Sequence, residues 1–143
     1  MHRKALAFGL VAAAAFALGL LAADAQESFT LQTEDLAWEP VDVAGLPAGI
    51  EARALHLNPR TQMSSSLIRY PQGFEEPRHY HETCGHYIYV LEGRIESPDG
   101  PLTPGMFTYA APKEAHGPYR VVEPSQVLFY TDGPFDFLVG EPR

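Results

Sequence analysis

Short runs of β-prone residues, separated by glycine and proline, follow one another along most of the chain. Apolar and polar residues alternate in the run 50–57, as expected for a strand with one buried face, and Asn58-Pro59 ends it. Similar runs are 64–70, 78–81, 86–91, 94–97, 106–110, 119–122, 127–131 and 135–139. After residue 25 no segment keeps a helical period, and the 13 prolines and 12 glycines of the chain would interrupt one. The pattern predicts an all-β domain built as a sandwich or barrel.

The first 25 residues have a different pattern. Basic Arg3 and Lys4 precede the apolar run 5–21, and the small residues Ala23 and Ala25 form a cleavage signature. We interpret residues 1–25 as a secretory signal peptide, which predicts a periplasmic or secreted protein. An uncleaved anchor is the alternative, because an apolar run of 17 residues lies near the lower limit for crossing a bilayer.

Cleavage after residue 25 would leave 118 residues, enough for one domain with its own core. We expect residues 26–47 to form an N-terminal arm anchored near Trp38, and residues 48–143 to form the domain. Eight basic and seventeen acidic residues would remain, a net charge of −9. Such a chain repels phosphate backbones and anionic lipid, so we expect no nucleic-acid partner and no membrane contact after cleavage.

Histidines supply the candidate chemistry. His79 and His81 are two positions apart, so on a strand their imidazoles point to the same side and can bind one ion together. His86 and His116 could complete a nitrogen-rich site. Neutral imidazole suits transition metals and disfavours calcium and magnesium, which prefer oxygen ligands. We predict one divalent transition metal ion per chain (Zn, Fe, Ni, Cu or Mn).

Two motifs around these histidines resemble those of the cupin superfamily. The first motif extends from Gly73 to Gly93 and contains His79, His81 and His86; five residues separate Gly73 from His79, four separate His81 from His86, and six separate His86 from Gly93. The second motif extends from Gly105 to His116. The commonest cupin pattern has glutamate where this chain has His86. The sequence is therefore most similar to small four-histidine cupins and to the cupin-like domain of ChrR-type anti-sigma factors. The resemblance implies a single-domain, jelly-roll β-barrel with His79, His81, His86 and His116 as ligands.

Cupins include enzymes and non-catalytic proteins, so the fold leaves the function open. One hypothesis is a dioxygenase-type metalloenzyme acting on a small metal-chelating organic substrate, with Tyr119 and Arg120 as candidate substrate contacts. The other is a non-catalytic module that binds or senses a metal or a small molecule. No residue stands out as a general base or nucleophile.

Alternation along the run 86–91 assigns its side chains to two faces. Ile88 and Val90 share the face of His86 and should line the barrel, whereas Tyr87 and Tyr89 point the other way. The two tyrosines would fit against a second sheet or a partner subunit; the second arrangement is common in cupin dimers, and we expect a homodimer.

Other polar residues near the histidines have ordinary interpretations. We expect Glu75 and Glu76 to lie in a polar loop at the barrel mouth and Glu82 to be solvated. His56, between Leu55 and Leu57, is expected to be a satisfied polar residue rather than a ligand. Cys84, the only cysteine, excludes an internal disulfide. It is expected to be a small buried hydrophobic residue, the alternatives being a soft fifth ligand or a reactive thiol.

Overall fold

The computed structural model describes residues 27–143, which are nearly all β-structure. One short 3-10 helix, η1 (Thr33–Asp35), precedes the strands. The strands are β1 (Glu39–Pro40), β2 (Glu51–Leu57), β3 (Ser64–Tyr70), β4 (Glu75–Glu76), β5 (His79–Tyr80), β6 (His86–Ser97), β7 (Gly100–Leu102), β8 (Phe107–Ala110), β9 (Tyr119–Thr131) and β10 (Leu138–Val139). The predicted all-β class is confirmed.

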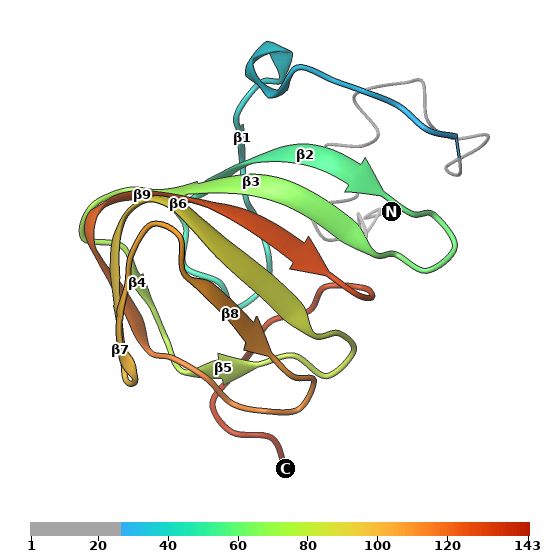
Figure 1. Ribbon diagram of the computed structural model, residues 1–143. Helices are drawn as coiled ribbons and strands as arrows, with labels where there is room; N and C mark the ends of the chain where they lie inside the picture. Colours follow the sequence, from blue (N-terminus) through green and yellow to red (C-terminus); the bar gives the residue numbers. More distant parts are fainter. Residues whose placement is uncertain (1–26) are drawn as a thin grey trace, which may run out of the picture.

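The strands form one large antiparallel sheet and one small one. The large sheet has eight strands, in the order β1-β2-β3-β9-β6-β7, with β4 also paired to β9 and β8 to β6. The small sheet pairs β5 with β10. Figure 1 shows the large sheet curling over at one end, so that β4 and β7 fold back towards β5. The result is a cupin-like jelly roll whose two sheets are not joined into a closed barrel.

Two strands are longer than the sequence pattern predicts. The separate runs 86–91 and 94–97 are one strand, β6, and the runs 119–122 and 127–131 are one strand, β9. The register between β6 and β9 shifts between Val90 and Ile95. This irregularity interrupts the alternation of apolar residues but not the pairing of the strands, so a prediction from alternation divides each strand in two.

The core lies on the concave side of the large sheet. Val90 and Val127 are fully buried and face each other in the register of β6 and β9. The other buried members of the cluster are Ile50, Ile68, Tyr70, Phe74, Ile95, Val121 and Phe129. Each strand buries alternate residues, which is why β9 can bury Val127 and Phe129 while it exposes Leu128.

The segment before β2 is packed onto this core. Val41 and Leu46 lie against the buried cluster, and the Val41 amide donates to the Ile50 carbonyl at 3.1 Å. Trp38 lies beneath two guanidinium groups, those of Arg53 at 4.5 Å and Arg69 at 4.6 Å from its ring centre. Arginine over an indole face is a favourable cation–π geometry.

The predicted signal peptide, residues 1–25, lies outside the described residues. Within residues 27–143, no helix is long and apolar enough to cross a membrane. The division into an arm and a domain stays a prediction.

Gly93 is required where β6 bends, and its replacement should show this. Its φ is +84°, and a Cβ atom there would clash with the Pro124 carbonyl and lie 2.6 Å from the Ser125 Cα. Gly93→Ala should therefore lower the free energy of unfolding by at least about 3 kcal/mol, measured by urea denaturation.

Gly73→Ala is the matched control, because φ at Gly73 is +83° and no atom lies within 4 Å of the added Cβ. Its cost should be only about 1 to 2 kcal/mol, the penalty for a left-handed backbone. Equal costs for the two variants would contradict the steric argument.

Candidate metal centre

Four histidine side chains from separate parts of the sequence meet in one buried cluster. His79 is in β5, His81 follows it, and His86 begins β6. His116 precedes β9 and pairs with His79 through two backbone hydrogen bonds of 3.0 and 2.9 Å. One ligand nitrogen from each of the four lies within 4.8 Å of the others. The structure therefore brings together all four residues that the sequence predicts as ligands.

Backbone carbonyls fix the orientation of three of these rings. The Nδ1 of His79 lies 2.8 Å from the Pro77 carbonyl, and the Nδ1 of His116 lies 2.9 Å from that of Glu114. The Nδ1 of His81 contacts the Asp136 carbonyl in the same way. A carbonyl only accepts, so each Nδ1 carries the hydrogen and each Nε2 offers a lone pair. Metal-binding histidines are commonly held by such contacts.

Two ring nitrogens in the cluster lack a partner. The Nε2 of His81 and the Nδ1 of His86 are buried without a hydrogen bond, although the Nε2 of His86 lies 2.9 Å from that of His116. An unsatisfied buried polar atom costs about 1 to 3 kcal/mol. A cation among the lone pairs would remove much of this cost, so the cluster fits a transition metal ion with nitrogen ligands.

Burial also keeps the four imidazoles neutral. It lowers the pKa of His79 to about 3 and holds the pKa of His86 well below its usual range. The pKa values of His81 and His116 are lowered for the same reason. The removal of a charged ring from water is the main cause, and the neighbouring imidazoles add to it at His79 and His86. Neutral imidazole is the form that binds metals.

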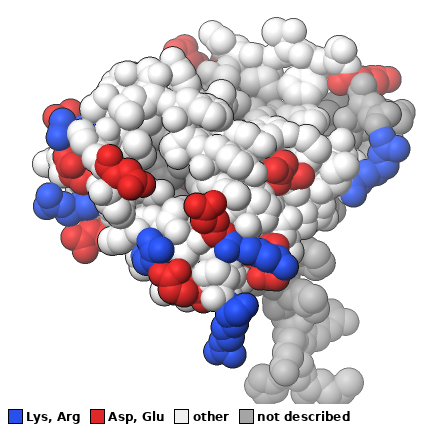
Figure 2. All heavy atoms as spheres, turned by 60° about the horizontal axis from the view of Figure 1, so that its bottom comes forward, with Lys and Arg blue, Asp and Glu red and all other residues white. Residues whose placement is uncertain are grey.

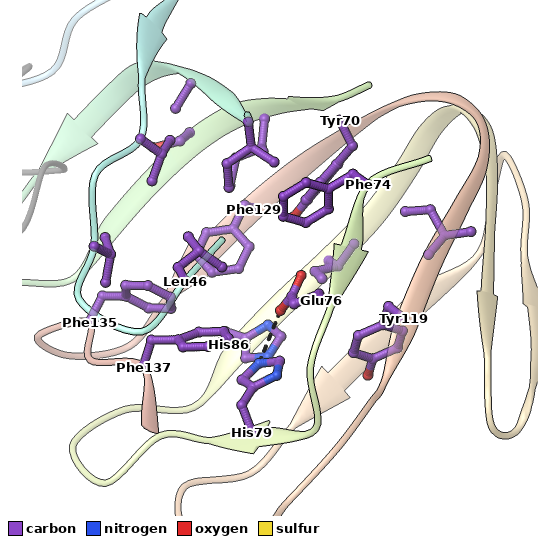
Figure 3. A pocket seen from close by; sticks show the side chains of 18 of the residues that line it. Leu46, Tyr70, Phe74, Glu76, His79, His86, Tyr119, Phe129, Phe135 and Phe137 are labelled. Atoms are coloured by element: carbon purple, nitrogen blue, oxygen red, sulfur yellow. Dashed lines mark ion pairs between the residues drawn. The ribbon is translucent and has the colours of Figure 1, made fainter. Parts of the chain in front are cut away.

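A cavity of about 70 Å³ adjoins the histidine cluster (Figure 3). Its walls are mostly aliphatic and aromatic, and include Leu46, Phe74, Ile88, Phe129, Phe135 and Phe137. Among the described residues that line it there is no lysine or arginine, and Glu76 is the only carboxylate. A cavity of this kind suits a small, largely apolar molecule with a few polar atoms.

Glu76 is the site residue that sequence reasoning missed. Its neighbour Glu75 is exposed as expected, but the Glu76 side chain is only 16% exposed and its Oε1 lies 3.2 Å from His79 Nε2. Burial raises the pKa of Glu76 to about 7. The available signal was Phe74, two positions earlier, which is buried. Residues two positions apart on a strand point to the same face, so Glu76 would be expected to point inward as Phe74 does. A strand of two residues is too short for alternation to reveal this.

The two predicted substrate contacts lie in different places. Tyr119 lines the cavity, and burial together with the charge of Glu76 raises the pKa of its hydroxyl to about 12. Arg120 is exposed and does not line the cavity, because alternation along β9 turns it to the opposite side. A role of Arg120 in substrate binding therefore stays a prediction.

The segment after β9 closes one side of the cluster. Phe137 stacks on His79 with ring centres 4.1 Å apart, and Phe135 lies 4.9 Å from His81. The Asp136 carboxylate accepts hydrogen bonds from the backbone amides of Glu82 at 2.9 Å and Thr83 at 3.3 Å. These contacts hold the loop between His81 and His86.

Cys84 lies in that loop and is buried. Cys84, His81 and Asp136 form a second group whose potential ligand atoms lie within 4.8 Å of one another. Burial raises the pKa of the thiol to about 12, so the thiolate that binds metals is disfavoured. With the Asp136 carboxylate engaged by the loop, the geometry favours the expectation of a small buried residue.

Two further expectations can be compared with the structure. Glu82 is exposed and forms an ion pair of 3.0 Å with Lys113. His56 does not belong to the four-histidine group; its ring lies 5.7 Å from that of Phe29.

Comparison with solved structures finds the same fold in several proteins. A protein from Methylibium petroleiphilum PM1, provisionally assigned as an acetylacetone dioxygenase, superposes with a TM-score of 0.66 at 19% identity, over 81% of this chain and 83% of its own. An acetylacetone dioxygenase from Acinetobacter johnsonii gives a TM-score of 0.58 at 20% identity, over 75% and 74%. The polyketide cyclase RemF from Streptomyces resistomycificus gives a TM-score of 0.58 at 22% identity, over 78% of this chain and 82% of its own. Identities this low show the fold alone.

No curated protein matches the sequence. The family model of the ChrR cupin-like domain matches residues 26–136, more than half of the chain. It spans both cupin-like motifs and all four clustered histidines. The chain therefore belongs to the ChrR cupin-like domain family.

Proposed function

We propose that this protein binds one divalent transition metal ion through His79, His81, His86 and His116 and acts as a dioxygenase-type metalloenzyme. The observation that carries the proposal is the convergence of four neutral imidazoles at the edge of an apolar cavity. The substrate is a small organic molecule that chelates the ion. The likeness to acetylacetone dioxygenases supports this class, since it establishes a common fold.

The protein side chains have clear roles in such a reaction. Once bound, a redox-active ion such as Fe(II) would supply Lewis acidity and electrons for chemistry with O₂. Ile88, Phe129 and Phe135 line the cavity and exclude water from it. The Tyr119 hydroxyl stays protonated at neutral pH because of its raised pKa, so it can donate a hydrogen bond to a substrate oxygen.

A binding or sensing module is the second candidate function. Four nitrogen ligands can saturate a tetrahedral ion and leave no position for substrate, as in structural zinc sites. The presence of histidine at position 86, where the commonest cupin pattern has glutamate, and membership of the ChrR cupin-like family both favour this candidate.

We further propose that the protein is exported and forms a homodimer. Export rests on the signal-like pattern of residues 1–25 and can be tested by fractionating cells. The dimer rests on an exposed apolar face formed by neighbouring positions of β6, β8 and β9, where Tyr89 faces Phe107 and Leu128 in register. These three side chains are 43%, 63% and 39% exposed. Sedimentation velocity would measure the dimer.

The distribution of charged side chains on the surface favours a small-molecule ligand over a polyanion such as a nucleic acid. Figure 2 shows basic side chains scattered among acidic ones on the face in view, with broad areas that carry neither. The net charge of the chain is −8. A polyanion would find no concentration of positive charge on this face.

Replacement of single histidines tests the ligand set. His81→Ala and His116→Ala should each abolish stoichiometric metal binding, and His86→Ala should weaken it by orders of magnitude, because each removes one of the converging nitrogens. His56→Ala should leave the metal content nearly unchanged. The measurement is elemental analysis of the purified variants, and equal metal content in all four would refute the assignment.

Acid should destabilise the metal-free protein. The unfolded histidines take up protons below pH about 6.5, whereas folded His79, with its pKa lowered to about 3, does not. The unfolded state then binds more protons, so stability falls as the pH falls from about 6.5 towards 3, by up to about 1.4 kcal/mol per pH unit for each such histidine. Glu76 opposes this with the slope of one group, because its pKa, raised from 4.5 to about 7, favours the folded state as the pH falls over that range; the lowered pKa values of the four clustered histidines outweigh it.

Urea denaturation between pH 6 and 4 measures the slope of this dependence. His79→Gln should make the slope shallower, while His56→Ala should preserve it. A metal-free protein whose stability rises on acidification over this range would contradict the predicted burial of neutral imidazoles.

Oxygen consumption distinguishes the two functions. With Fe(II) and a panel of β-diketones, flavonols and thiols, the wild type should consume O₂ in the presence of its substrate, and His79→Ala should not. Tight metal binding and metal-dependent thermal stabilisation without turnover on any substrate or metal would instead favour the binding module.

A further inference from the structure

The Glu76 carboxylate approaches the histidine cluster from the cavity side. Figure 3 shows its side chain pointing towards His79 and His86, below Phe74. The backbone holds it there: Glu76 is opposite Tyr119 in the pairing of β4 with β9, and the Val121 amide donates to the Phe74 carbonyl at 2.9 Å. The 3.2 Å contact with His79 Nε2 is therefore fixed by strand pairing rather than by a flexible loop.

The atoms at this contact are both acceptors. Because Nδ1 of His79 gives its hydrogen to the Pro77 carbonyl, Nε2 of the neutral ring has a lone pair and no hydrogen. This lone pair faces a carboxylate oxygen. Two acceptors at 3.2 Å repel unless a positive charge or a proton lies with them. With Nδ1 engaged, Nε2 is the nitrogen that His79 can offer to the cluster. The Glu76 carboxylate is not in the group whose ligand atoms all lie within 4.8 Å of one another, so its contact with the cluster is the one with His79.

Among the described residues, Glu76 forms no ion pair with a lysine or arginine; Arg120, opposite Glu75 in the pairing of β4 with β9, is exposed. The described residues that line the cavity include no lysine or arginine. Of the nearby basic side chains, Arg78 pairs with Glu141 and Lys113 pairs with Glu82. A buried carboxylate without a positive partner is costly. Equally, four neutral imidazoles leave a divalent ion with its full charge in an apolar cavity. One cation at the cluster would resolve both problems.

We propose that Glu76 is a fifth metal-binding residue, which joins the four histidines from the cavity side. The proposal rests on the proposed function in one respect, namely that the histidine cluster holds a metal ion. Glu76 would give the site one hard oxygen ligand and reduce the net charge of the ion with its ligands from +2 to +1. It would also be the ligand nearest to a molecule that enters the cavity, and a chelating substrate would displace it, because five protein ligands leave a six-coordinate ion only one open position.

Cobalt binding to the metal-free full-length protein tests this assignment. Co(II) is titrated into the wild type, Glu76→Gln and Glu75→Gln, and both the dissociation constant and the visible absorption of the bound ion are measured. Glu76→Gln should weaken binding by about 10- to 100-fold, and its absorption should become more intense as the site loses a ligand. Glu75→Gln, the matched control, should bind as the wild type does, because Glu75 is exposed.

The glutamine variant separates a ligand from a hydrogen-bonding group. Its amide can donate to His79 Nε2 but carries no charge, so unchanged affinity and absorption in Glu76→Gln would overturn the proposal. Glu76→Ala should show the same weakening, and thermal unfolding of the metal-free variants checks that both are folded. Failure of the wild type to bind Co(II) would overturn the metal site itself, a result distinct from the failure of Glu76 alone.

Discussion

The pairing of β6 with β9 is the interaction on which the rest of the structure depends. These two strands are the longest of those described, and their contact contributes Val90 and Val127 to the core. Along the same pair lie one clustered histidine, His86 at the start of β6, and Tyr119 at the start of β9. The register between the two strands shifts next to Gly93, where β6 bends. The same pair of strands thus contributes residues both to the core and to the candidate site.

The site combines polar nitrogens with an apolar setting, and this combination has a cost. Burial keeps the imidazoles neutral and able to bind an ion, but it also leaves His81 Nε2 and His86 Nδ1 without partners. The carbonyls of Pro77, Glu114 and Asp136 offset part of the cost, because they orient three rings through Nδ1. Buried polar atoms without hydrogen-bond partners are expected where the missing partner is a ligand.

Segments remote in the sequence complete the pocket. Leu46 comes from the chain before β2, and Phe135 and Phe137 come from the chain after β9. Asp136, between the two phenylalanines, ties the same segment to the loop that follows His81. A change in this C-terminal segment therefore acts on both the cavity wall and the position of His81, so the cavity and the histidine cluster depend on the same segment.

The sequence by itself determined the class of fold and the identity of the clustered histidines. Glycine and proline punctuation predicted short strands, and the i, i+2 spacing of His79 and His81 predicted one pair of ligands, because both signals are local in the chain. The resemblance of two motifs to those of cupins added His86 and His116 to the cluster. The continuity of β6 and β9 was decided by tertiary structure, since a bulge breaks alternation while interstrand hydrogen bonds continue.

The inward position of Glu76 was also decided only by the tertiary structure. Glu76 belongs to the short pairing between β4 and the start of β9, where a side chain's direction depends on the partner strand. No pattern within the two residues of β4 can specify that direction. The chemistry of the site therefore depends partly on residue types and partly on which strand each residue meets in the fold.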